Sequence, residues 1–310
     1  MKKLKNSIRR KTNQIKYYFI GVRTYSFIKR IHTPNPLKGS GPRFKGEFAV
    51  KCKDNKTFKL YNNAFYIETS FFWHGFENNP WELEFRKIWV ELCTHSSTIF
   101  DIGANSGIFS VLAKTYNASA EVYAFEPQPN IYNALSKNSE INNFKIHCNQ
   151  MALSNKPGTV PFYNYGMDTF SDINTTAGSL NNKWREKDQH AIMVEAETLD
   201  NFIEKHSINP IDLIKMDVET YEFEVLEGYL KNIVLHKPII LLEILNKDIG
   251  NKIQHLFKSE EHSFYEISEE KGLQSIKNIG HSESTTNYII CPNSKKNTLD
   301  QAKKNLALMN

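Results

Sequence analysis

The hydrophobic pattern of the chain alternates between strand-like and helix-like segments over most of its length. Short apolar runs typical of buried strands recur between segments whose apolar residues return every three or four positions, as in amphipathic helices. Such alternation predicts an α/β fold with a mostly parallel sheet and helices on both faces. Strands are expected at 98–103, 121–126, 145–151, 211–217, 238–244, 263–267 and 286–291, and helices at 107–117, 129–140, 221–231 and 246–258.

The same pattern gives the expected organisation of the chain. The last two strands have no clear helix between them, so the final strand is expected to be antiparallel. Residues 48–67 alternate like one or two strands, and Pro80–Cys93 has apolar residues at helical spacing. We therefore divide the chain into a basic extension, lead-in strands with a helix, an α/β domain carrying an insertion, and a polar tail: 1–45, 46–95, 96–292 with insertion 155–197, and 293–310.

A turn of small residues follows the first strand of the α/β domain, in TIFDIGANSGIFSV. Small residues let the backbone approach a ligand closely, and a helix N-terminus presents free N–H groups. The D-x-G-x-x-x-G spacing differs from the G-x-G-x-x-G that seats a diphosphate, and an acid before the glycines suits a ligand with an ammonium group. A turn made for packing alone is the other interpretation. The candidate binding residues here are Asp101, Gly103, Ala104, Asn105 and Gly107.

The next predicted strand, EVYAFEP, ends in Glu126. In a strand–helix–strand unit the second parallel strand opens onto the same crevice as the first. A carboxylate there can accept hydrogen bonds from both hydroxyls of a ribose. Asp101 for an amino-acid end and Glu126 for a ribose together describe S-adenosylmethionine (SAM). The alternative is that Glu126 is a surface acid capping the helix after Pro129.

At this point the chain resembles FkbM-type SAM-dependent methyltransferases, from about Phe65 to Pro292. The motifs that carry the resemblance occur in the family's order: DIGANSGIFSVLA, VYAFEPQPNIYNAL, MALSNKPGTV, TLDNFI, IDLIKMDVETYEFEVLEG and PIILLEIL. The resemblance implies a Rossmann-like class I methyltransferase with a seven-stranded, mostly parallel sheet and an antiparallel last strand. It also implies methyl transfer to a hydroxyl, often on a sugar. One position departs from the family, which usually has Gly where this chain has Thr220.

Methyl transfer to a hydroxyl needs a group that removes the proton, and three carboxylates are candidates. Asp217 and Glu219 follow the fourth strand and Glu243 ends the fifth. These strands are neighbours in this fold, so one acid could be the general base, or the set could hold Mg²⁺. Alternatively, Glu219 caps a helix and Glu243 is structural. His74 is a further candidate base from outside the sheet.

The adenine is expected where the third strand ends, near Gln150, Met151 and Ala152. Met151 would offer an apolar surface, and the backbone or Gln150 would meet the exocyclic amine. The competing interpretation makes Met151 an ordinary core residue.

The long interval between the third and fourth strands is the expected acceptor region. Thr159–Tyr163 and Ile192–Ala196 have the pattern of two extra strands flanking a polar stretch without periodicity. Its hydroxyl and amide side chains suit hydrogen bonding to a sugar, and Phe170 or Trp184 could stack on a sugar face. A disordered surface loop is the alternative.

Charge separates the N-terminal extension from the rest. The chain carries a formal net charge of +5, yet residues 1–45 hold 13 Lys or Arg and no acid, which leaves the remainder acidic. An acidic domain argues against nucleic acid along the cleft. The extension is too short and too charged to span a bilayer, but a basic amphipathic segment can lie on an anionic membrane surface. The alternative is a solvated extension packed on the domain.

The four cysteines are scattered without a C-x-x-C, which argues against a zinc site or a disulfide framework and suits a reducing cytoplasm. The basic extension adds the expectation of peripheral contact at the inner membrane face. The favoured function is O-methylation of a saccharide in surface-glycan biosynthesis. Methylation of a small metabolite or lipid hydroxyl is the second hypothesis, and a non-catalytic SAM-binding module the third.

Overall fold

The computed structural model describes residues 26, 29, 44–52, 54–165, 178–183, 189–280 and 282–309. The chain forms two compact units, Met1–Trp81 and Glu82–Asn310. Most of the basic extension, together with Phe170 and Trp184, lies outside the described residues. Within the described part of the chain, no helix has the length and apolar character needed to cross a bilayer.

In the described part of the first unit, strands β1 (Lys45–Lys51) and β2 (Thr57–Asn63) form an antiparallel pair and are followed by α3 (Tyr66–His74). Every second residue of the pair is buried, because one face of the ribbon packs against α3. Phe44, Phe48 and Phe72 meet edge to face, with ring centroids 4.4–5.7 Å apart.

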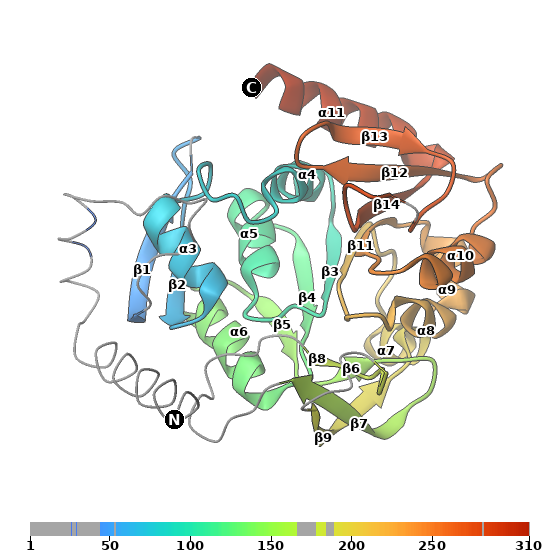
Figure 1. Cartoon of the computed structure of the whole chain (residues 1–310), viewed down its shortest axis with the longest axis horizontal. Coiled ribbons are helices and arrows are strands. Elements are labelled where there is room, and N and C mark those ends of the chain that lie inside the picture. Colours follow the sequence, from blue (N-terminus) through green and yellow to red (C-terminus); the bar gives the residue numbers. More distant parts are fainter. Residues whose placement is uncertain are drawn as a thin grey trace, which may run out of the picture. The chain divides into compact units, whose positions relative to one another are not determined.

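The second unit is built on one large sheet (Figure 1). Among its described residues, eight strands follow the order β13-β12-β14-β11-β10-β3-β4-β5. The parallel part comprises β3 (Thr98–Ile102), β4 (Glu121–Phe125), β5 (Ile146–Asn149), β10 (Leu213–Met216) and β11 (Ile239–Glu243). The antiparallel pairings involve β12 (His262–Ser268), β13 (Gly272–Ile276) and β14 (Asn287–Pro292). The Rossmann-like arrangement and the antiparallel last strand are confirmed.

The strand count differs from the expected seven because β13 was not predicted. Only Leu273 of its five residues is buried, so the segment has no apolar run to mark it. It pairs with β12 as a hairpin at the edge of the sheet.

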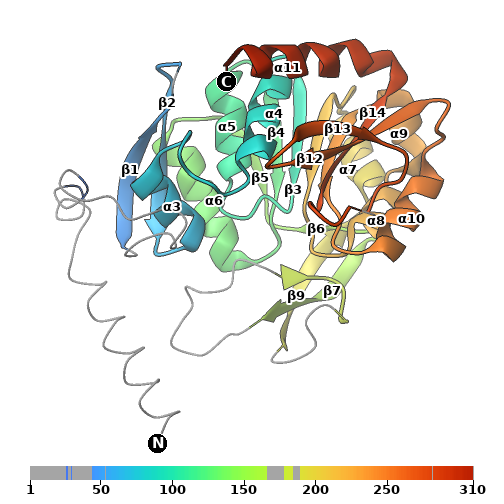
Figure 2. The same ribbon diagram turned by 45° about the horizontal axis from the view of Figure 1, so that its top comes forward.

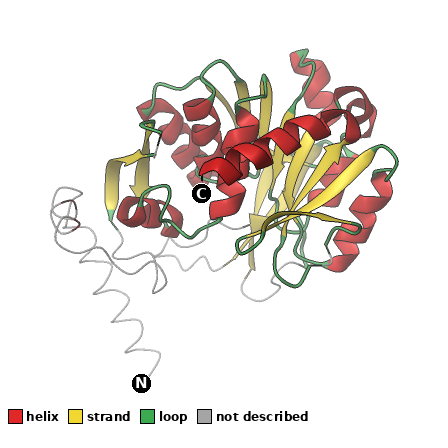
Figure 3. Cartoon of the chain, turned by 90° about the horizontal axis from the view of Figure 1, so that it is seen from above, coloured by secondary structure: helices red, strands yellow, loops and turns green. Residues whose placement is uncertain are grey.

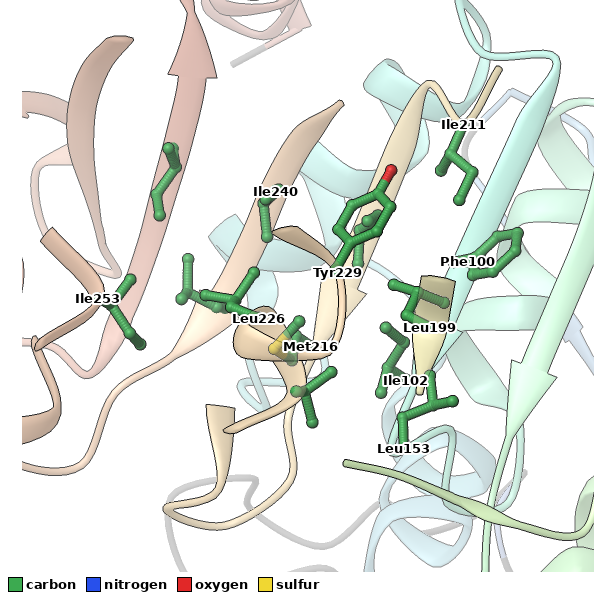
Figure 4. Close-up of a cluster of buried hydrophobic side chains, with 14 of the residues drawn as sticks. Phe100, Ile102, Leu153, Leu199, Ile211, Met216, Leu226, Tyr229, Ile240 and Ile253 are labelled. Atoms are coloured by element: carbon green, nitrogen blue, oxygen red, sulfur yellow. The ribbon is translucent and has the colours of Figure 1, made fainter. Parts of the chain in front are cut away.

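Helices cover both faces of the sheet (Figure 3). Contacts link α4, α5, α6 and α11 on one side and α7–α10 on the other. Figure 4 shows the second of these interfaces, where Phe100, Ile102 and Met216 of the strands lie near Leu199 and Leu226 of the helices and near Tyr229, which precedes α9. The helices are α4 (Leu83–Cys93), α5 (Ile108–Tyr116), α6 (Pro129–Ile141), α7 (Leu199–His206), α8 (Glu222–Glu227), α9 (Leu230–His236), α10 (Lys247–Leu256) and α11 (Lys296–Met309).

Two helical features differ from the expectation. The segment 221–231 is not one helix, since α8 ends at Glu227 and α9 begins at Leu230. Gly228, between them, lies so close to Ser154 that a Cβ atom there would come within 2.2 Å of the Ser154 carbonyl oxygen. Residues expected to form a polar tail carry α11, whose Leu299 and Ala302 are buried.

The insertion forms a second sheet that extends from one end of the main sheet (Figures 1 and 2). Its described strands are ordered β6-β9-β7-β8. Both expected strands are present and are longer than predicted, and two short strands join them: β6 (Ala152–Leu153), β7 (Gly158–Tyr165), β8 (Gly178–Ser179) and β9 (Gln189–Glu197).

Candidate functional site

The glycine turn after β3 is held against its neighbours by close packing. Gly103 has φ +70°, and a Cβ there would lie 1.8 Å from the Asp217 carbonyl oxygen. Gly107 has φ +83° and faces the Leu135 side chain. The backbone N–H groups of Gly103 and Ala104 both donate to the carbonyl of Phe125, at 3.1 and 2.9 Å. Glycine is therefore needed at 103 for both conformation and space, and the turn is fixed at the carboxyl ends of β3, β4 and β10.

A pocket opens at this end of the sheet and encloses about 590 Å³, part of it open to solvent. Seven of the predicted site residues line it: Gly103, Asn105, Glu126, Met151, Ala152, Asp217 and Glu219. Ala104, Gly107, Gln150, Asp101 and Glu243 are not among the lining residues. The sequence predicted the insertion as the acceptor region but did not single out Phe162, Gly178 and Leu180, which form another part of the pocket wall.

Glu126 is fixed beside the glycine turn by two backbone hydrogen bonds. The Asn105 N–H donates to Oε2 at 3.0 Å and the Gln128 N–H donates to Oε1 at 2.9 Å. The residue is 6% exposed, and this burial raises its pKa to about 7. Each carboxylate oxygen can accept a further hydrogen bond, so Glu126 can still serve a ligand in the pocket.

Asp101 is completely buried rather than open to the pocket. The Ser110 hydroxyl donates to its Oδ2 at 2.6 Å, and the Lys215 ammonium lies 3.8 Å from its Oδ1. Burial raises the pKa of Asp101, against the opposing effects of Lys215 and Ser110.

Lys215 is a functional candidate that sequence reasoning missed. It lies on β10, is 3% exposed, and its Nζ donates to the Gly103 carbonyl at 3.0 Å and to Asp217 Oδ2 at 3.4 Å. Burial opposes the charge, but Asp217, Asp101 and Glu82 outweigh it, so the pKa of Lys215 is above its usual value. The available signal was a lysine inside the apolar run IDLIKMD.

The three predicted carboxylates, Asp217, Glu219 and Glu243, interact electrostatically, but their environments differ. Asp217 and Glu219 line the pocket, whereas Glu243 accepts a hydrogen bond from the Thr286 hydroxyl at 2.9 Å. Burial, followed by the negative charge of Asp217, raises the pKa of Glu243 to about 9. Glu82, which the sequence did not single out, belongs to the same electrostatic group, and burial raises its pKa to about 7.

These residues do not fit a metal centre. Among the described residues, no group of three or more His, Cys, Asp and Glu side chains is placed to hold a metal ion. The cation beside Asp217 is the Lys215 ammonium, at 3.4 Å. His74, the alternative base, is buried in α3 of the other unit.

The loop after β10, residues 217–221, has an unusual backbone and is here termed the acid loop. Glu219 and Thr220 both have positive φ, 53° and 75°. The buried Glu222 supports the loop, because its Oε1 accepts the N–H groups of Val218 and Thr220 at 3.3 and 3.2 Å. Burial raises the pKa of Glu222 to about 8.

A mostly parallel sheet with an antiparallel final strand, a glycine turn after its first central strand and an acid at the end of the next define the class of Rossmann-like methyltransferases. The family model for the methyltransferase FkbM domain matches residues 101–270, more than half of the chain, and the chain belongs to this family.

Curated relatives share part of this domain. The chain is 25% identical over 161 residues to hexuronic acid methyltransferase AglP of Haloferax volcanii, covering 51% of this chain and 60% of that protein. It is 30% identical over 152 residues to 31-O-demethyl-FK506 methyltransferase FkbM of Streptomyces tacrolimicus, covering 42% and 58%. The chain thus spans about three fifths of the length of these relatives.

Among solved structures, the methyltransferase FkbM from Methylobacillus flagellatus KT matches 63% of this chain and 43% of its own, with 17% identity and a TM-score of 0.41.

Proposed function

We propose that this protein is a SAM-dependent O-methyltransferase that acts on a hydroxyl of a saccharide. The observation that carries the proposal is one pocket walled by the glycine turn, by the fixed carboxylate of Glu126 and by the partly exposed carboxylate of Asp217. Membership of the FkbM family supports methyl transfer.

The residues of the pocket fit SAM. Gly103 and Asn105 of the glycine turn line the pocket, and Glu126 supplies acceptors for the ribose hydroxyls. Met151, Ala152 and Leu153 offer an apolar wall for adenine. Because Gln150 is exposed and does not line the pocket, the exocyclic amine of adenine would donate to the protein backbone instead. Since Asp101 is buried, its contribution is to hold Lys215 and Ser110 rather than to touch the ammonium group.

Asp217 is the preferred general base. When bound, SAM supplies an electrophilic methyl group, which joins the acceptor oxygen as S-adenosylhomocysteine leaves and the hydroxyl proton passes to the base. The Lys215 ammonium donates a hydrogen bond to Asp217 Oδ2 and thereby orients the carboxylate. Glu219 is the second carboxylate on the pocket wall, whereas Glu243, with a pKa of about 9, holds its proton at neutral pH.

A saccharide is favoured as the acceptor for two reasons. AglP, a relative, is a hexuronic acid methyltransferase, and the acceptor side of the pocket carries the aromatic residues Phe162 and Tyr221, suited to stacking on a sugar face. We place the reaction in surface-glycan biosynthesis in the cytoplasm, with the basic segment 1–45 contacting the membrane. The relative that acts on 31-O-demethyl-FK506 supports a small-molecule hydroxyl as the second candidate.

The test is transfer of label from methyl-labelled SAM to a panel of methyl hexuronosides, methyl hexosides and simple alcohols, using the full chain. We expect at least one saccharide to gain the mass of one CH₂. Asp217→Asn should lower its turnover roughly 100-fold or more while SAM still binds. Label on simple alcohols alone, or bound SAM without transfer to any acceptor, would overturn the proposal.

Activity insensitive to EDTA is expected, because Lys215 occupies the position beside Asp217.

A further inference from the structure

The acid loop contains a threonine in a backbone conformation that threonine disfavours. Thr220 has φ +75° and directly follows Glu219 at +53°. Left-handed backbone is costly for residues with a branched Cβ, and glycine is the residue that adopts it freely. A threonine at this position therefore needs a compensating interaction.

The compensating interaction comes from the insertion. The Asn181 amide nitrogen, Nδ2, donates to the Thr220 hydroxyl at 2.8 Å. Nearby, the Ser179 hydroxyl donates to the Val218 carbonyl at 3.4 Å. Both donors belong to residues 178–183, here termed the β8 segment. Glycine at 220 could not accept the Asn181 hydrogen bond through a side chain.

The β8 segment is itself shaped to present Asn181. The Asn181 N–H donates to the Ser179 hydroxyl at 2.9 Å, and the Lys183 N–H donates to Asn181 Oδ1 at 3.0 Å. The amide oxygen is thus used within the segment, which leaves the amide nitrogen for Thr220.

This contact joins two parts of the pocket wall. Gly178 and Leu180 line the pocket from the β8 segment, and Val218, Glu219 and Tyr221 line it from the acid loop. Gly178 packs on the Phe162 ring, since a Cβ there would lie 2.3 Å from its Cε1. The β8 segment and the acid loop, which includes Asp217, are therefore joined parts of the same pocket wall.

We propose that Thr220 and Asn181 are specificity-determining residues whose hydrogen bond fixes the β8 segment as the acceptor-side wall of the pocket. The assignment of this wall to the acceptor rests on the proposed function, whereas the contact itself does not. The hydrogen bond itself joins the β8 segment to the acid loop and involves neither Glu126 nor the glycine turn, so we expect it to act on the acceptor rather than on SAM.

The contact is tested by hydrogen exchange on the full chain, comparing wild type with Thr220→Val, Asn181→Ala and Thr220→Ser. Val keeps the shape of Thr without the hydroxyl, and Ser restores the hydroxyl. We expect amides of residues 178–183 to exchange about fivefold faster in the first two variants, and at the wild-type rate in Thr220→Ser. Exchange in 98–107 should not change. Equal rates in all four proteins would overturn the proposal, and this experiment needs neither SAM nor acceptor.

The acceptor role is tested with any saccharide of the panel that wild type methylates. Thr220→Val and Asn181→Ala should raise its KM about fivefold or change the preferred panel member, with SAM affinity by calorimetry unchanged. Thr220→Ser should restore both values. An unchanged KM and preference despite faster exchange would overturn the specificity role. Failure of the proposed function is distinct, because wild type would then methylate no saccharide.

Discussion

At the scale of single residues, Glu222 illustrates how a buried carboxyl group supports the site without lining it. Its Oε1 accepts two N–H groups of the acid loop, while burial raises its pKa to about 8. The folded state therefore holds a proton that the unfolded chain loses near the ordinary carboxyl pKa. Below that ordinary pKa the stabilisation is fully present, and it is lost as pH rises towards about 8.

We expect Glu222→Gln, which keeps the shape without the titration, to lose less stability than wild type as pH rises from 5 to 8. A difference of one bound proton changes the free energy of unfolding by about 1.4 kcal/mol per pH unit. Urea unfolding at several pH values measures the two slopes. Glu243 retains its own raised pKa in both proteins, so only the difference between slopes is informative. Equal pH dependence of the free energy of unfolding in the two proteins would contradict the raised pKa of Glu222.

At the scale of elements, the strands of the main sheet were predictable, including the edge strand β5, and the edge strand β13 was the exception. Mostly apolar, buried runs mark β3, β4, β10 and β11, whereas β13 has a single buried residue and leaves no such signal. Gly228, which separates α8 from α9, lies against the carbonyl of Ser154, 74 positions earlier in the chain, where a side chain would not fit. Such a contact is invisible to local periodicity.

The elements that meet at Lys215 give an element-scale prediction. Its ammonium joins the turn after β3 to the end of β10, through the Gly103 carbonyl and two carboxylates. Lys215→Met would leave Asp101 buried without its counter-charge, so we expect the free energy of unfolding to fall by about 3 kcal/mol.

Lys137→Met is the control for that prediction, because Lys137 pairs with Glu140 on the surface of α6. Exposed pairs contribute little, and this variant should unfold like wild type. Chemical denaturation of both variants decides the matter. A stable Lys215→Met protein would show that the buried ion pairs do not hold the two elements together.

At the scale of the whole molecule, the sequence motifs located the pocket because parallel strands end at one edge of the sheet. Gly103, Glu126, Met151 and Asp217 come from different strand ends and line one cavity. The sequence could not show that Asp101 is turned away into the core, that Lys215 lies between two acids, or that Asn181 reaches Thr220. Each of these depends on side-chain packing between distant segments.

The central claim, that this pocket binds SAM through Glu126, is tested most directly by calorimetry of SAM binding to the full chain at pH 8. Wild type should bind one SAM per chain, and Glu126→Ala should bind about tenfold more weakly or worse. Hydrogen bonds to a charged group contribute roughly 1.5–3 kcal/mol each, and 1.4 kcal/mol is about tenfold in affinity. Glu121→Ala, at an exposed position at the start of β4, the strand that Glu126 follows, should bind like wild type. Equal affinity of wild type and a folded Glu126→Ala, or no binding by wild type, would contradict the account.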